Sequence, residues 1–143
     1  MVEIRKVTEN FSVAPQVEAA DFSAIAAAGF RHVLNNRPDG EIMGQLTSAE
    51  AETAAIDAGV TYHHAPFQGP PTEEAVNALE AQIDTATGPV LAYCRTGTRS
   101  ITAWAVMEGR KGNMSADEIV AAGRQAGYDL EPMKDLLRSL SKR

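Results

Sequence analysis

The feature that most constrains the fold is an apolar run, a short polar loop and a second apolar run in direct succession, over residues 89–107. Val90 to Tyr93 is unbroken apolar sequence, typical of a central strand covered on both faces. Cys94 follows at the carboxyl end of this predicted strand, where open α/β sheets place their ligand sites. The next residues, RTGTRS, carry the chain into a mostly apolar helix. The stretch therefore predicts a strand, a loop and a helix with a cysteine at the turn.

This loop has the composition of an anion site. Backbone N–H groups at the start of a helix converge on one point near the positive end of the helix dipole. A thiol held there should ionise more readily than a free thiol, and the thiolate is the nucleophilic form. Gly97 lets the backbone approach an anion, and Arg99 can bind it with its fork of N–H groups. We predict a nucleophilic Cys94 with Arg99 beside it; a small buried structural cysteine is the alternative. The remaining predicted loop ligands are Arg95, Thr96, Gly97, Thr98 and Ser100.

Length and composition indicate one globular domain over residues 1–143, with 44% hydrophobic and 22% charged residues. A single cysteine excludes an internal disulfide, a thiolate-rich zinc site and a resolving cysteine within this sequence. The net charge of −6 argues against non-specific nucleic-acid binding. Against this acidic background, four cations are expected to cluster around the Cys94 loop and its helix: Arg95, Arg99, Arg110 and Lys111. With no signal core or membrane-length apolar run, we expect a soluble, cytoplasmic protein.

The whole chain alternates predicted strands with predicted helices. This order favours an α/β fold of three layers, a mostly parallel central sheet flanked by helices. A helix capped by Asp21 is expected over residues 21–28, before the predicted strand at residues 30–34. Residues 60–65 are expected to form a third core strand. His63 and His64 alternate on that strand without a third ligand, so packing or surface roles are favoured and neither a metal nor a cofactor is predicted. Predicted strands lie in residues 2–14 (two, joined near Glu9 and Asn10), 30–34, 60–65 and 90–93; predicted helices lie at 21–28, 47–58, 72–87, from 115, and 131–140.

Three stretches carry a resemblance to a known family: Ser12-Val13 with Gln16, residues 29–41 with the segment NNRPDGE, and AYCRTGTRS at residues 92–100. With them the sequence resembles the bacterial family described as the phosphatase-like domain of beta-lactamase hydrolase-like proteins, a family that is also labelled as sulfur transferases. The resemblance implies a fold like that of dual-specificity phosphatases, with Cys94 as nucleophile and Arg99 as anion clamp. It also makes bacterial sulfide metabolism the context to test.

Two features depart from the phosphatase pattern. Four residues separate Cys94 from Arg99, whereas those phosphatases have five, and the shorter loop has the length found in rhodaneses. The segment in which phosphatases carry an acidic residue reads Pro66-Phe67-Gln68, and an amide cannot act as a general acid. Asp39 in the neighbouring loop is the candidate substitute, although Pro38-Asp39-Gly40 is also an ordinary turn sequence.

Sulfur transfer needs less machinery than phosphate ester hydrolysis, because sulfite leaves thiosulfate without being protonated. We therefore predict a rhodanese-type sulfurtransferase that moves sulfane sulfur from a small anion, such as thiosulfate or a persulfide, to a thiol such as glutathione through a Cys94 persulfide. The alternative is a phosphatase that forms a phosphocysteine on a phosphate ester, and the second alternative is a redox or anion sensor. Arg37 either adds charge to the site or pairs with Glu41. A persulfide-oxidising enzyme is a candidate partner; no nucleic acid or membrane is expected.

Overall fold

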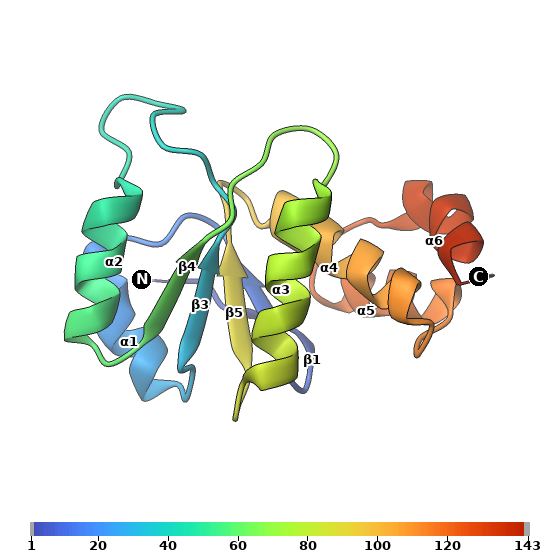
Figure 1. Ribbon diagram of the computed structural model, residues 1–143, viewed down its shortest axis with the longest axis horizontal. Coiled ribbons are helices and arrows are strands. Elements are labelled where there is room, and N and C mark those ends of the chain that lie inside the picture. Colours follow the sequence, from blue (N-terminus) through green and yellow to red (C-terminus); the bar gives the residue numbers. More distant parts are fainter. Residues whose placement is uncertain (1, 142–143) are drawn as a thin grey trace.

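The computed structural model describes residues 2–141 and contains one five-stranded sheet with helices on both faces (Figure 1). This confirms the predicted three-layer α/β fold. Among the described residues, no helix has the length and apolar character needed to cross a bilayer. The strands are β1 (Arg5–Thr8), β2 (Phe11–Ala14), β3 (His32–Asn35), β4 (Thr61–His64) and β5 (Val90–Tyr93). The helices are α1 (Phe22–Ala27), α2 (Ser48–Asp57), α3 (Glu73–Thr85), α4 (Thr98–Lys111), α5 (Ala116–Gln125) and α6 (Lys134–Leu140).

The strands run in the order β1-β2-β5-β3-β4, with β1 antiparallel to β2 and all other pairs parallel. β5 is the central strand, and all four of its residues are buried, as its apolar run predicts. Tyr93, its last residue, pairs with Ala14 of β2 and Asn35 of β3. The carboxyl ends of three neighbouring strands therefore meet at one edge of the sheet, and Cys94 follows directly from the middle one.

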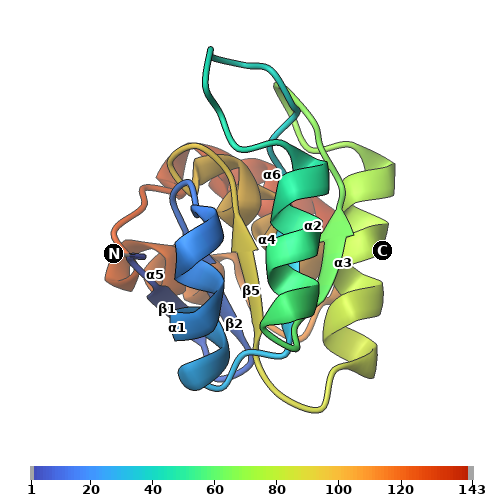
Figure 2. The ribbon, with the colours of Figure 1, turned by 90° about the vertical axis from the view of Figure 1, so that its left-hand side faces the viewer.

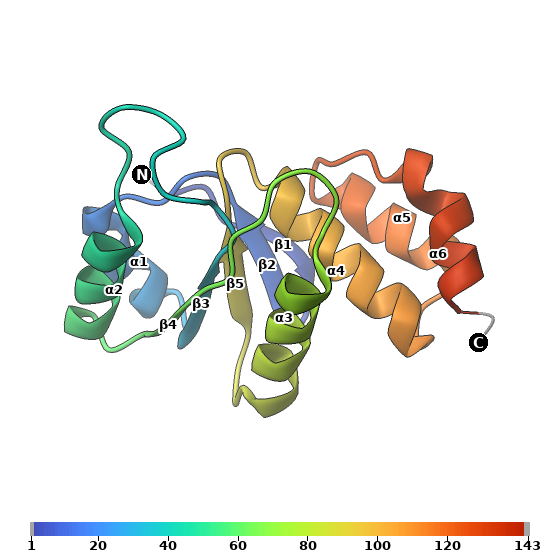
Figure 3. The same cartoon turned by 45° about the horizontal axis from the view of Figure 1, so that its top comes forward.

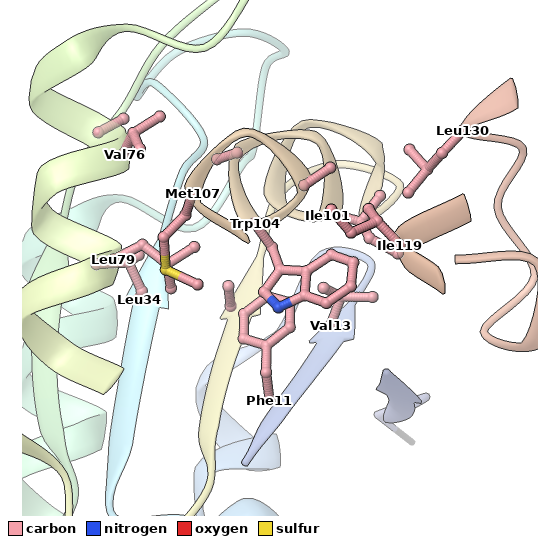
Figure 4. Packing of buried hydrophobic residues seen from close by; sticks show 14 of the residues in the cluster. Phe11, Val13, Leu34, Val76, Leu79, Ile101, Trp104, Met107, Ile119 and Leu130 are labelled. Carbon is pink, nitrogen blue, oxygen red and sulfur yellow. The ribbon is translucent and has the colours of Figure 1, made fainter. Parts of the chain in front are cut away.

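Each face of the sheet has its own core. α1 and α2 cover one face (Figure 2), where Phe22 and Ile25 pack with Leu91 and Tyr93. α3 and α4 cover the other face, with α5 and α6 packed beyond α4. There Trp104 stacks on Phe11, with ring centroids 5.8 Å apart and ring planes 5° from parallel (Figure 4). Trp104, one turn after Ser100, is thus a core residue that anchors α4 against the sheet.

The starts of α2, α3 and α5 lie where the sequence predicts them, with Thr72 capping α3, whereas the predicted cap of α1 is wrong. The Thr47 and Ser115 side chains cap α2 and α5, each in a reciprocal capping box with the glutamate three residues later. Asp21, expected to cap α1, instead accepts a hydrogen bond from the Glu18 N–H group at 2.9 Å, within a 3-10 turn that precedes the helix. Asp21 already has helical dihedral angles, and a capping residue normally needs an extended backbone.

Two other elements differ from the prediction. β4 lies at the edge of the sheet rather than in the core, so Thr61 and His63 are exposed and His64 is half-buried. The residues of a strand do not by themselves tell whether it lies in the middle or at the edge of a sheet. The expected helix over residues 131–140 is a 3-10 turn (Glu131–Met133) followed by α6, with Pro132 in the turn.

The expected cluster of four cations is also wrong. Arg110 and Lys111 lie at the C-terminal end of α4, about 16 to 18 Å along the helix from Arg99 at 1.5 Å per residue. There they contact α3: Lys111 donates to Asp84 at 3.0 Å, and Arg110 donates to Asn77 at 3.0 Å. Positions close in sequence on a long helix lie far apart in space, so these two cations belong to helix packing rather than to the Cys94 site.

Candidate functional site

Three loops meet at the carboxyl edge of the sheet, above the ends of β3, β4 and β5 (Figures 1 and 3). The loop after β3, residues 36–47, projects furthest and carries Arg37, Asp39 and Glu41. The loop after β4, residues 65–72, carries Gln68. The loop after β5 contains Cys94 and runs into α4. The parallel sheet thus brings together residues that lie far apart in the sequence.

Cys94 lies at the base of its loop, with only 1% of its surface exposed. Its Sγ atom accepts a hydrogen bond from the Gly97 N–H group at 3.1 Å. Gly97 has a φ of +92° and is the residue immediately before α4, so the tight turn that aims its N–H group at the sulfur requires glycine. Thr96 and Thr98 share a hydrogen bond of 3.0 Å between their hydroxyls, and Arg95 is exposed at the rim. Of the predicted loop ligands, Gly97 thus contacts the thiol through its N–H group, and the roles of Arg95, Thr96 and Thr98 as anion ligands stay predictions.

The fork of Arg99 binds a carboxylate of this same chain. Its two Nη atoms donate to the two carboxylate oxygens of Glu41, each at 2.8 Å, and Nη1 also donates to the Phe67 carbonyl at 3.2 Å. The Glu41 carboxylate raises the pKa of Arg99, and the neighbouring Cys94 sulfur adds to this effect. Arg99 thus binds Glu41 directly and interacts electrostatically with Cys94. The sequence predicted the cation but gave no signal for this partner, which is 58 residues away.

Glu41 binds two arginines at once. Besides Arg99, it accepts from Arg37 Nε at 2.8 Å and from Gln68 at 3.0 Å. These donors, Arg99 first, hold the pKa of Glu41 well below its usual range, so the carboxylate stays ionised at neutral pH. Arg37 is 2% exposed and also donates to Gln16 at 2.9 Å. Of the two roles considered for Arg37, the structure shows the pairing with Glu41, which extends into a network that joins all three loops, and its role as an anion ligand stays a prediction.

A second set of hydrogen bonds, between uncharged groups, connects the same three loops. The Ser100 hydroxyl donates to the Asn36 side-chain oxygen at 2.8 Å, and the Asn36 amide donates to the Ala65 carbonyl at 2.9 Å. All of these groups are buried, so their bonds offset the cost of desolvating them. Ser100, predicted as an anion ligand, thus has its proton committed to Asn36. In the structure it holds the loop after β3 against α4.

Asp39 and the two histidines have structural contacts. The Asp39 carboxylate accepts from the backbone N–H group of Ser48 at 2.8 Å, at the N-terminal end of α2. His64 Nε2 lies 2.8 Å from the Arg37 carbonyl, and His63 is exposed on β4. Within residues 2–141, no group of three histidine, cysteine, aspartate or glutamate side chains is placed to hold a metal ion. The contact of Asp39 with Ser48 does not test catalysis, so the acid role of Asp39 stays a prediction.

Comparison with known proteins gives the same fold and a family. The model of the family described as "Beta-lactamase hydrolase-like protein, phosphatase-like domain" matches residues 3–111. A beta-lactamase hydrolase-like protein of Agrobacterium fabrum is 36% identical over 126 residues, which is 87% of this chain but only 29% of that protein. The chain thus spans less than a third of the length of this curated relative.

Solved structures extend the likeness to nearly the full chain. A candidate phosphatase from Neisseria meningitidis is 34% identical and superimposes with a TM-score of 0.83, covering 96% of this chain and 97% of its own. A kinase-associated phosphatase with 12% identity reaches a TM-score of 0.70 over 100% of this chain and 97% of its own, which shows a shared dual-specificity phosphatase-like fold. On the match over residues 3–111, this chain belongs to the phosphatase-like domain family of the beta-lactamase hydrolase-like proteins.

Proposed function

We propose that the protein is a sulfurtransferase in which Cys94 carries the transferred sulfur as a persulfide. The observation that carries this proposal is that both carboxylates of the loop after β3, those of Asp39 and Glu41, already have hydrogen-bond partners within the chain. Glu41 is held ionised by Arg99 and Arg37, and Asp39 accepts from the N-terminal end of α2. A reaction whose leaving group needs no proton suits this arrangement better than one that requires a carboxylic acid.

Thiosulfate meets this condition. The Cys94 thiolate attacks its outer sulfur, the S–S bond of thiosulfate breaks with its electron pair on sulfite, and Cys94 is left as a persulfide anion. The Gly97 N–H group, 3.1 Å from the sulfur, and the start of α4 stabilise negative charge at this position. Arg99, beside Cys94, binds the incoming dianion through the N–H groups that Glu41 does not use.

A thiol outside this sequence completes the cycle, because the chain has a single cysteine. The thiolate of an acceptor such as glutathione attacks the outer sulfur of the persulfide and releases Cys94 as a thiolate. The proposal places this exchange in the cytoplasm, where thiols are kept reduced. A persulfide-oxidising enzyme, which would consume the glutathione persulfide, remains the proposed partner.

The proposal is tested by intact mass after the reduced protein is incubated with thiosulfate. We expect a gain of roughly 32 Da, one sulfur atom, that cyanide or glutathione removes. Protein alkylated beforehand with iodoacetamide is the matched control, since a single cysteine fixes the site of the adduct. An unchanged mass with thiosulfate and with a persulfide donor contradicts sulfur transfer. If phosphate ester turnover is also absent, the sensor alternative follows.

Phosphate ester hydrolysis through a phosphocysteine is the second candidate, and the comparisons favour it. The family description refers to a phosphatase, and the Neisseria structure is described as a candidate phosphatase at 34% identity. In this reaction the leaving alkoxide or phenoxide needs a proton, and Asp39 is the candidate donor.

Asp39→Asn separates the two candidates. The amide oxygen retains an acceptor for the Ser48 N–H group, so we expect the fold and sulfur transfer to change less than twofold. An acid role predicts a loss of phosphate ester turnover of about 100-fold or more. Initial rates with thiosulfate and cyanide, and with an aryl and an alkyl phosphate, measure both effects. A large loss restricted to the alkyl phosphate would favour the phosphatase.

A further inference from the structure

Tyr128 brings a hydroxyl group to the Cys94 loop from the segment that joins α5 to α6. Figure 3 shows this segment passing the N-terminal end of α4. The Tyr128 hydroxyl donates to the Thr96 carbonyl at 2.8 Å. Residue 128 lies outside the range 3–111 that the family model matches, and nothing in its local sequence indicates a role at the site.

The bond acts on the peptide group that faces the sulfur. The Thr96 carbonyl and the Gly97 N–H group are the two ends of one planar peptide unit. One end accepts from Tyr128 at 2.8 Å, and the other donates to Cys94 Sγ at 3.1 Å. A planar unit held at its carbonyl cannot rotate its N–H group away without breaking that bond. A donor at the carbonyl also polarises the peptide and strengthens the hydrogen bond made by its N–H group.

Packing around Gly97 supports a close fit. A Cβ atom added to Gly97 would overlap the Tyr128 hydroxyl, so the phenol lies directly against the glycine Cα. The Tyr128 ring is held in turn by the Arg5 guanidinium from β1, 5.2 Å from the ring centroid, and its backbone N–H group donates to the Gly123 carbonyl at 2.8 Å. Two elements outside the loop therefore fix the position of the hydroxyl.

We propose that Tyr128 is a positioning residue that holds the Thr96–Gly97 peptide with its N–H group directed at Cys94. The inference rests on the proposed role of Cys94 as nucleophile, but not on whether sulfur or phosphate is transferred. Within residues 2–141, Arg99, paired with Glu41, and Tyr128 interact electrostatically with Cys94, and Arg5 faces the Tyr128 ring. Burial raises the pKa of Tyr128, so its hydroxyl remains a neutral donor through the pH range in which a thiol titrates.

The test is the pH dependence of Cys94 alkylation in Tyr128→Phe. Iodoacetamide reacts with the thiolate, and the single cysteine makes intact mass a site-specific readout. Without the hydroxyl, we expect the pH midpoint of alkylation to rise by about 0.5 to 1 unit, as one weakened hydrogen bond to the thiolate implies. Alkylation below the midpoint should slow by about 3- to 10-fold, with the high-pH plateau unchanged.

Tyr93→Phe is the matched control. It makes the same chemical change next to Cys94, but the buried Tyr93 hydroxyl has Tyr62 of β4 as its polar neighbour and makes no hydrogen bond to the Cys94 loop among the described residues, so its removal should leave the midpoint unchanged. If Tyr128→Phe lowers thermal stability but leaves the midpoint within 0.2 units of wild type, Tyr128 is a structural brace and the proposal is wrong.

A second measurement on the wild-type protein keeps the test independent of the variant. The backbone amide resonance of Gly97 in nuclear magnetic resonance should titrate with the same midpoint as Cys94 alkylation, because its proton points at the sulfur. A Gly97 resonance that does not follow this titration overturns the proposed route. Neither readout uses a substrate, so failure of the sulfur-transfer proposal would leave both results interpretable.

Discussion

Cys94→Ser is expected to reduce turnover by at least about 1,000-fold, whether the enzyme transfers sulfur or hydrolyses phosphate esters. A serine hydroxyl remains protonated at neutral pH. The nearby carboxylates are not free to act as its base, because Glu41 is paired with Arg99 and Arg37 and Asp39 accepts from the Ser48 N–H group. The variant also cannot form a persulfide. Thiocyanate formation from thiosulfate and cyanide, and phosphate release from an aryl phosphate, measure the loss.

The substitution should leave the fold intact, because serine is slightly smaller than cysteine and its oxygen can accept the Gly97 N–H group. Thermal unfolding of Cys94→Ser should therefore resemble that of wild type. Turnover retained at one tenth of the wild-type rate or more would show that the chemistry takes place elsewhere. Loss of activity together with loss of folding would call for Cys94→Ala, which keeps the site small and apolar.

Glu41→Gln is expected to destabilise the protein by about 2 kcal/mol, less than the cost of breaking a fully buried ion pair, because the Glu41 and Arg99 side chains are 15% and 20% exposed. The carboxylate neutralises Arg37, which is 2% exposed, and accepts both Nη atoms of Arg99. A neutral amide of the same shape leaves two cations without a counter-charge. Denaturant unfolding at pH 7 measures the difference, and Glu52→Gln on the exposed surface of α2 is the matched control, with an expected change below about 0.5 kcal/mol.

The same pair gives the stability of the wild type a specific pH dependence. The pKa of Glu41 is lowered in the folded protein by Arg99, with Gln68 and Arg37 adding to the effect, whereas the unfolded value is about 4.5. The unfolded chain therefore binds the proton first as pH falls, so the contribution of Glu41 is fully present above the unfolded pKa and is lost progressively below it. The stability difference between wild type and Glu41→Gln should shrink from pH 6 to pH 3. A difference that stays constant would contradict the ion-pair explanation.

Local sequence was sufficient for the strand–loop–helix unit around Cys94. The apolar run of Val90 to Tyr93, the glycine at residue 97 and the apolar residues of α4 act over a few positions each, and all appear where the pattern predicts them. The helix starts at Thr47 and Ser115 were predicted for the same reason, because the donor and acceptor of each capping box lie three residues apart. The pairing of Arg37 with Glu41 was also within reach, since both lie in one loop.

The tertiary structure determined which residues contact Arg99 and the Cys94 loop. Arg99 meets Glu41 across 58 residues, and Tyr128 meets Thr96 across 32, because the strand order and the packing of α5 against α4 bring these segments together. The length of α4 places Arg110 and Lys111 away from the loop, where they contact α3, and the strand order leaves β4 at the sheet edge. Backbone preferences and apolar periodicity extend over a turn of helix or a short strand, whereas ion pairs between elements depend on where each element lies. The sequence by itself therefore determined the candidate nucleophile Cys94 and the loop that holds it, and only the fold determined the partners of Arg99 and of the Gly97 peptide.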